Sequence, residues 1–257
     1  MSHIHIPDGV LPLWLVGLGW LVTGVILLLA LRSLRRADRV RVVPHIGVMA
    51  ALVIAAMSTE LVPIAYHVNL TVLAGIVLGP AASAVAAFVV NLVLALFGHG
   101  GITVVGLNTI VIAVEMVGGS LLFRAARRRL PSRPGLAAGL TTIVVLFLST
   151  TLMIGIVGLS GVSPSGARDT GALDPATLSV SNPLHEGLFA NRIVSPEHET
   201  VVADAHLSLA RFAVAIYALG VIGWTIEALL IGYLVAFIAR VRPGLLRNPL
   251  LGGLGWT

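Results

Sequence analysis

The chain has eight histidines and eleven acidic residues, which are side chains of the types that can bind a metal. Two of the histidines stand close to the amino terminus. His3 and His5 lie in the opening sequence MSHIHIPDG. Neutral imidazole is a good ligand for nickel, cobalt, copper and zinc. The chain has no cysteine, so a metal site must use nitrogen and oxygen ligands. The pattern indicates metal binding, and chance surface histidines are the alternative interpretation.

A free terminal amine close to a histidine adds a further way to bind a metal. If Met1 is retained, the amine-X-His pattern of Met1, Ser2 and His3 supplies four nitrogens in a plane. If Met1 is removed, Ser2 and His3 supply three nitrogens, and the fourth must come from elsewhere, for which His5 and His67 are candidates. Strong-field nitrogens in a plane favour Ni(II), Cu(II) and low-spin Co(II).

Other ligand-type residues lie beside later apolar segments. His67 stands in AYHVNL, His99 in FGHGG, and Asn108 follows shortly after. Glu60 lies near the outer end of the second apolar segment and is interpreted as a brace between helices. Acceptance of the second N–H of a metal-bound imidazole is the alternative. His45 begins an apolar segment and is interpreted as an interfacial residue.

The composition is that of a polytopic helical membrane protein. The 257 residues are 57% hydrophobic and 11% charged, with a mean hydropathy of +1.01, whereas soluble domains carry about 25% charged residues. Apolar stretches long enough to cross a hydrocarbon core of about 30 Å recur along the chain. The net charge of +5 would suit nucleic acid, but the chain has no lysine, and its sixteen arginines cluster between apolar segments. That distribution is typical of membrane loops and argues against nucleic-acid binding.

We predict an all-α integral membrane protein with about seven crossings in one domain, residues 1–257. The predicted segments are Leu11–Arg32, Pro44–Val62, Asn69–Leu78, Ala81–Phe97, Thr103–Phe123, Leu136–Leu159 and Leu207–Ile238. The third is short and ends at Gly79-Pro80, so a broken or tilted helix, or a bent hairpin with the fourth segment, is the alternative. A break at that depth is tolerated where protein or water covers the backbone.

The arginines predict the orientation. With the amino terminus outside, thirteen of the sixteen arginines fall on the cytoplasmic side, and most acidic residues fall outside. Residues 1–10, His67 and His99 then face the same side, and residues 241–257 form a cytoplasmic tail. The first span is preceded by no positive charge and is too long for a signal peptide, so we expect it to remain attached.

Residues 160–206 form the only long polar segment, between the six spans of residues 11–159 and the last span, residues 207–240. Their Ser, Pro, Gly and acidic content predicts a loosely packed external loop. A metal-collecting surface around His185, His198 and His206 is the alternative.

Glu115 and Glu227 fall inside predicted spans, where charged groups are costly and usually functional. We interpret each as a brace between helices, with orientation of a metal-bound histidine as the alternative. Gly47, Ala51 and Ala55 recur every four residues on the second span, and such small residues let another helix approach closely. This face is either internal packing or a docking face for another membrane subunit.

Four stretches, HIPDGVLP, GVMAALVIAAM, FGHGGITVVGLN and IEALLIGYLVAFIARVRPGLL, are similar to one family. They resemble the CbiM/NikM family, the substrate-capturing S components of cobalt and nickel energy-coupling-factor (ECF) transporters. The resemblance is dense over Met1–Leu130 and recognisable in the last span. It implies an S component with an extra amino-terminal helix, in the cell membrane of a prokaryote.

The resemblance also implies a ligand set. In the family the terminal amine, a leading histidine with its peptide nitrogen, and a histidine after the second helix bind the metal. His5 matches the leading histidine and His67 the later one, but three extra residues separate Met1 from His5, whereas the family begins at Met-His. The expected metal site consists of Met1, Ser2, His3, His5 and His67, with His99, Asn108 and Glu60 as supporting residues.

By resemblance, the chain captures Co(II) or Ni(II) outside the cell as the transported substrate of an ATP-driven importer. It has no Walker A motif, so ATP hydrolysis would take place in two cytoplasmic ATPase subunits. These would act through a membrane coupling (T) subunit, often with a small accessory membrane subunit. Gly47, Ala51 and Ala55 are the candidate docking face for the T subunit. Nitrogen donors alone do not distinguish cobalt from nickel.

Two other classes of function have less support. A secondary carrier would use Glu115 or Glu227 as a proton site and would transport without partners. A membrane protease is suggested by GLSG at Gly158–Gly161 and by His185-Glu186. The first lacks a histidine partner in a later span, and the second lacks a histidine four residues on. We therefore expect no enzymatic activity in this chain.

Overall fold

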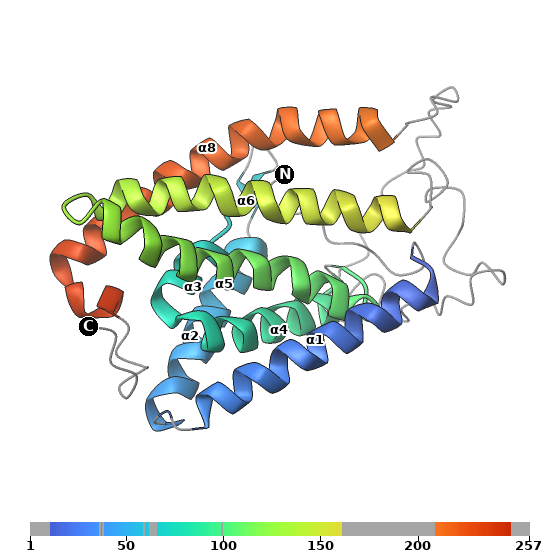
Figure 1. Ribbon diagram of the computed structural model, residues 1–257, viewed down its shortest axis with the longest axis horizontal. Coiled ribbons are helices and arrows are strands. Elements are labelled where there is room, and N and C mark those ends of the chain that lie inside the picture. The colour runs from blue at the N-terminus through green and yellow to red at the C-terminus, as the bar shows by residue number, and fades with distance from the viewer. Residues whose placement is uncertain are drawn as a thin grey trace.

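The computed structural model describes residues 11–35, 37, 39–58, 60–61, 66–98, 100–160 and 209–247. Most of its helices run side by side along the long axis of the molecule (Figure 1). The elements are α1 Leu13–Leu34, α2 Arg39–Ser58, β1 Glu60–Leu61, β2 Tyr66–His67, α3 Thr71–Leu78, α4 Pro80–Leu96, α5 Val105–Arg129, α6 Pro134–Leu159, α8 Leu209–Val241 and the 3₁₀ helix η1 Pro243–Arg247.

The described helices confirm an all-α membrane fold. Five of them, α1, α2, α5, α6 and α8, are long and apolar enough to cross a membrane, and α4 is a shorter apolar helix. Large apolar side chains remain exposed on the outer sides of α1, α6 and α8. Such a surface is expected where lipid, rather than water, surrounds the protein.

Helix α5 forms the centre of the bundle. It packs against α1, α3, α4 and α6. In its most apolar stretch 61% of the residues are buried, compared with 22% for α1, so α1 lies at the periphery. A main apolar core joins α2, α3, α4, α5, α6 and α8, and a second cluster joins α1 to the ends of α5 and α6.

The third predicted segment is a short helix that pairs with the next one. Helix α3 has eight residues, which span about 12 Å, too few to cross a bilayer alone. All eight are buried, so protein covers this part of the chain on every side. Gly79 turns the chain with φ of 79°, a conformation that glycine adopts without strain, and α4 begins at Pro80. This is the bent hairpin that the sequence left as an alternative.

Prolines account for two of the shifted helix boundaries. Helices α4 and α6 begin at Pro80 and Pro134, where the missing N–H costs nothing because first-turn amides have no helical partner. The predicted starts lay one and two residues later. In α2, Pro44 lies within the first turns rather than at the start, and the helix ends at Ser58, before strand β1.

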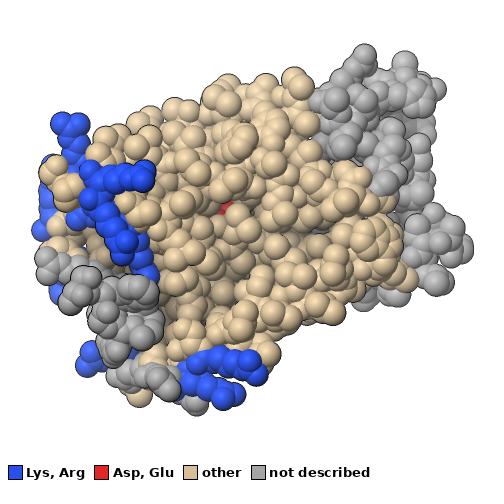
Figure 2. Space-filling model, viewed as in Figure 1, with Lys and Arg blue, Asp and Glu red and all other residues tan. Residues whose placement is uncertain are grey.

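The arginine side chains visible in Figure 2 gather at one end of the molecule. That end carries the α1–α2 connection, the α5–α6 turn and the end of α8 with η1. The predicted charge asymmetry is therefore realised in the described residues, and the positive-inside rule assigns this basic end to the cytoplasm.

Candidate metal site and its supporting framework

Most of the predicted metal ligands lie outside the described residues. These are Met1, Ser2, His3 and His5, together with the supporting residue His99. His67 is described as backbone, in β2. Among the described residues there is no group of three or more His, Asp or Glu side chains able to hold a metal. The ligand set therefore stays a prediction. The structure describes the packing and hydrogen bonds of the segments that adjoin the predicted ligands.

Strands β1 and β2 bring Glu60 and His67 into register. The two strands pair antiparallel, with Glu60 opposite His67 and Leu61 opposite Tyr66. In an antiparallel pair, directly opposite residues lie on the same face, with Cβ atoms about 4.5–5.5 Å apart. The acidic residue and the histidine predicted to work together thus occupy partner positions, although seven positions separate them along the chain.

The chain after β2 enters α3 through a buried turn. The Asn69 side-chain oxygen accepts a 2.8 Å hydrogen bond from the backbone N–H of Thr71. This is a local side-chain-to-backbone turn of the kind Asn favours, and it satisfies one of the amides at the start of the helix. Asn69 and Thr71 are both almost completely buried.

The carboxyl group of Glu115 accepts hydrogen bonds from three side chains. Asn69 donates from Nδ2 at 2.9 Å and Thr71 from Oγ1 at 2.6 Å, both to Oε2, while Ser149 donates from Oγ to Oε1 at 2.7 Å. Glu115 is only 1% exposed. A buried acidic group is tolerated when its oxygens are hydrogen-bonded, so this network joins α5, α6 and the start of α3.

The network also fixes the depth at which α3 begins. Glu115 lies ten residues into α5, about 15 Å along the helix from its first residue. Because Asn69 and Thr71 bond to it, the segment that follows His67 lies well inside the bundle. The bracing role predicted for Glu115 is therefore what its contacts show.

The second cluster anchors the beginning of α1 next to the start of α5. Trp20 donates from Nε1 to the carbonyl oxygen of Thr103 at 2.7 Å, and Thr23 donates to that of Gly106 at 2.7 Å. Leu11 and Leu15 pack in the same cluster as Val104, Leu107 and Ile156. The chain just after the predicted amino-terminal ligands is thus held against residues 103–107, within the FGHGGITVVGLN stretch.

The other polar residues singled out in the sequence lie within helices. Asn108 is buried in the first turn of α5, and its backbone N–H donates to the carbonyl of Val104 at 3.0 Å. Asn91 donates within its own helix to the carbonyl of Ala87. Glu227 is buried in α8. His45 is hydrogen-bonded to the Arg41 carbonyl near the basic end.

Asn69, Thr71 and Ser149 are the contributors that the sequence analysis missed. Each is a short polar residue within or beside an apolar segment, which is the one signal that could have found them.

The structure does not gather Gly47, Ala51 and Ala55 into the core. All three lie on the exposed side of α2, and a Cβ added at Gly47 would meet no atom within 4 Å.

Comparison with known proteins gives consistent results. The protein-family model for the cobalt uptake substrate-specific transmembrane region, CbiM, matches residues 5–245. A Haloquadratum walsbyi protein whose name describes metal transport is 36% identical over 158 residues, which cover 59% of this chain and 72% of that protein.

Two solved structures share the fold. The crystal structure of a transition metal transporter superposes with a TM-score of 0.66 at 19% identity, covering 93% of both chains. A truncated transition metal transporter superposes with a TM-score of 0.64 at 17% identity, covering 92% of this chain and 99% of the other.

Proposed function

Because the chain belongs to the CbiM family of cobalt uptake substrate-specific transmembrane proteins, we propose that it is the metal-capturing subunit of an ATP-driven ECF importer. Its substrate is Co(II) or Ni(II), taken from the outside. The chain carries out no catalysis, and ATP hydrolysis takes place in two separate cytoplasmic subunits, coupled through a membrane T subunit. The observation that carries the proposal is the family match across residues 5–245.

The metal is bound by nitrogen donors from two parts of the chain. The terminal amine and the imidazoles of His3 and His5 come from the amino-terminal segment, and His67 comes from β2. Two features of the framework support this arrangement. Residues 103–107 hold the chain that follows the amino-terminal segment, and Glu115 holds the chain that follows His67. Anchoring both sides limits the entropy lost when the ligands close around the ion.

Glu60 orients His67 in this proposal. Ligand imidazoles usually donate their second ring N–H to a fixed acceptor, which sets the tautomer and raises the basicity of the ligand nitrogen. The cross-strand pairing of Glu60 with His67 supports that role. His99 and Asn108 are assigned to the same supporting layer.

The T subunit docks on the exposed face of α2. Gly47, Ala51 and Ala55 lie along it, and side chains this small let a second helix approach closely. A secondary carrier has less support. Hydrogen bonds from three side chains make Glu115 a brace, whereas a proton site must change its partners during transport.

The test is a metal titration of the purified chain with Co(II), Ni(II) and Zn(II). Since loss of a supporting residue weakens metal sites by about 10–100-fold, His67→Ala should weaken binding by at least about 100-fold. His3→Ala and His5→Ala identify the leading histidine, with mass spectrometry used to define the actual amino terminus. His45→Ala, at the basic end of α2, is the matched control and should bind like the wild type. Unchanged binding in the other three variants would refute the site.

A further inference from the structure

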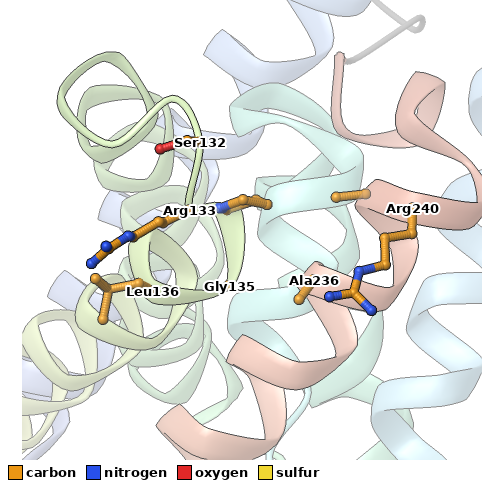
Figure 3. Close-up of a pocket in the computed structure, with 8 residues that line it drawn as sticks. Ser132, Arg133, Gly135, Leu136, Ala236 and Arg240 are labelled. Carbon is orange, nitrogen blue, oxygen red and sulfur yellow. The ribbon is translucent and has the colours of Figure 1, made fainter.

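A cavity of about 630 Å³ opens at the basic end of the molecule, away from the candidate metal site. It lies between the α5–α6 turn and the last turns of α8. Its lining residues are Ser132, Arg133, Pro134, Gly135, Leu136, Ala236, Ala239 and Arg240. Figure 3 shows Gly135 and Ala236 in the middle of this site, with the Arg133 side chain extending to one side and Arg240 on the other.

Three sources of positive potential meet at this cavity. Arg133 and Arg240 are exposed arginines, and none of the described residues that line the cavity is acidic. The third source is the start of α6, where Arg133 occupies the N-cap position without a side-chain cap hydrogen bond. The amides of Gly135 and Leu136 belong to the first turn, whose N–H groups have no partner within the helix and favour anions. The cavity therefore suits a phosphate-sized anion.

The turn that carries Arg133 is held in place by a neighbouring arginine. Arg127 donates from Nη1 to the carbonyl oxygen of Pro131 at 2.6 Å. This contact links the end of α5 to the turn. Arg127 is thus engaged in shaping the turn, while Arg133 and Arg240 line the cavity on its two sides (Figure 3).

A groove of about 390 Å³ continues from the cavity along the outer surface of α6 and α8. The two share Gly135 and Leu136. Its remaining lining residues are Gly139, Leu140, Ile143, Thr225, Ala228, Leu229, Gly232 and Tyr233. From Leu136 to Ile143 the groove extends about 10 Å along α6, from the basic end into the hydrocarbon region.

Small residues at the helix contact create this groove. A Cβ on Gly135 would lie 2.6 Å from the carbonyl oxygen of Gly232, so the two backbones touch there. Larger side chains flank the contact, and Leu140, Leu229 and Tyr233 are 48%, 70% and 72% exposed. The groove is therefore almost wholly apolar and opens toward lipid.

We propose that the cavity and groove together bind one anionic glycerophospholipid of the cytoplasmic leaflet. The phosphate lies among Arg133, Arg240 and the first-turn amides of α6, and one acyl chain lies in the groove. Two observations favour a lipid over a protein partner. The basic cavity and the apolar groove are continuous, and they match the polar and apolar ends of one molecule. Basic pockets between helices on the cytoplasmic side are also suited to anionic head groups.

The experiment measures thermal unfolding of the metal-free full chain in neutral detergent with added lipids. Phosphatidylglycerol should raise the Tm by about 2–6 °C at saturation, whereas phosphatidylcholine and free glycerol 3-phosphate should not. The double variant R133Q/R240Q should lose most of the phosphatidylglycerol shift. R128Q, an exposed arginine at the same end that does not line the cavity, should keep it.

A groove variant tests the acyl chain separately. Ile143→Trp fills the far end of the groove and should abolish the shift, while Val144→Trp, on the neighbouring lipid-facing surface, should not. The Tm in detergent alone reports whether each variant folds. A Tm shift from glycerol 3-phosphate equal to that from phosphatidylglycerol would mean a simple anion site and would contradict a lipid site. An equal Tm shift from phosphatidylcholine would mean non-specific solvation and would also contradict it. A phosphatidylglycerol shift unchanged in both Ile143→Trp and R133Q/R240Q would overturn the proposal. None of these readouts depends on metal binding.

Discussion

At the scale of single residues, Glu115 shows how a carboxyl group that is costly to bury can hold helices together once its oxygens are hydrogen-bonded. Three donors reach it from positions 34 to 46 residues away along the chain. The sequence reveals the carboxyl group, because a charge inside an apolar span is conspicuous. It does not reveal the donors, because Asn, Thr and Ser occur in many membrane helices and the pairing depends on the packing of α3, α5 and α6.

Removing one donor should destabilise the bundle measurably. Ser149→Ala takes one hydrogen bond from the buried Glu115 carboxyl and should lower the free energy of unfolding by about 1–2 kcal/mol. Thr142→Val, on the same helix, removes only a bond to the carbonyl of Ala138 four residues earlier and should cost less than about 0.5 kcal/mol. Denaturant unfolding in detergent compares the two. Equal losses would show that Glu115 does not depend on Ser149.

The pairing of Glu60 with His67 leads to a second residue-scale prediction. If Glu60 orients the imidazole, Glu60→Ala should weaken Co(II) or Ni(II) binding by about 10–100-fold without lowering the Tm of the metal-free chain. Titration calorimetry and thermal melting separate the two effects. Unchanged affinity with a folded variant would remove Glu60 from the site.

At the scale of elements, the apolar runs and Pro–Gly punctuation predict most helices within a few residues. The sequence could not tell whether segment 69–78 crosses the membrane, because that depends on what surrounds it. All eight residues of α3 are buried, and Gly75 lies against the backbone of Met116 in α5. Only the packed bundle shows that a helix this short is covered on every side.

Gly75 should therefore be the least replaceable glycine of the α3–α5 contact. A Cβ at this position would overlap the carbonyl oxygen of Met116, which belongs to the backbone and cannot rotate away. Gly75→Ala should cost about 1–3 kcal/mol or more. Gly118→Ala is the matched control, because its Cβ would sit 3.6 Å from Val145 Cγ2, an ordinary contact, and should be neutral or stabilising by about 0.5–1 kcal/mol. A similar Tm for both variants would contradict the close approach.

The exposed small-residue face of α2 makes a prediction about assembly. Ala51→Trp should block T-subunit association and uptake while leaving metal binding intact, because a bulky ring keeps the partner helix away. Leu148→Trp, at an exposed position on α6, is the control for adding a ring to the lipid-facing surface. Co-purification with the T subunit and metal titration provide the two readouts. Normal co-purification of Ala51→Trp would place the docking face elsewhere.

At the scale of the whole molecule, charge distribution is the property that the sequence predicts best. The positive-inside rule needs only the order of spans and arginines, and the arginines visible in Figure 2 do gather at one end. The metal site is predicted less completely. The proposed ligands belong to two separate segments, one before α1 and one in β2. The described structure shows only how the chain next to each segment is held, through residues 103–107 and through Glu115.

The orientation can be tested directly, because the chain has no cysteine of its own. Ser33→Cys introduces one thiol near the end of α1, at the basic end, and Ser160→Cys introduces one just after α6, at the opposite end. Both substitutions nearly preserve side-chain size. In intact cells a membrane-impermeant maleimide should label Ser160→Cys, and it should label Ser33→Cys only after the membrane is opened. If the reverse pattern were found, the basic end would face outward, and neither metal capture from outside nor a lipid site in the cytoplasmic leaflet would hold.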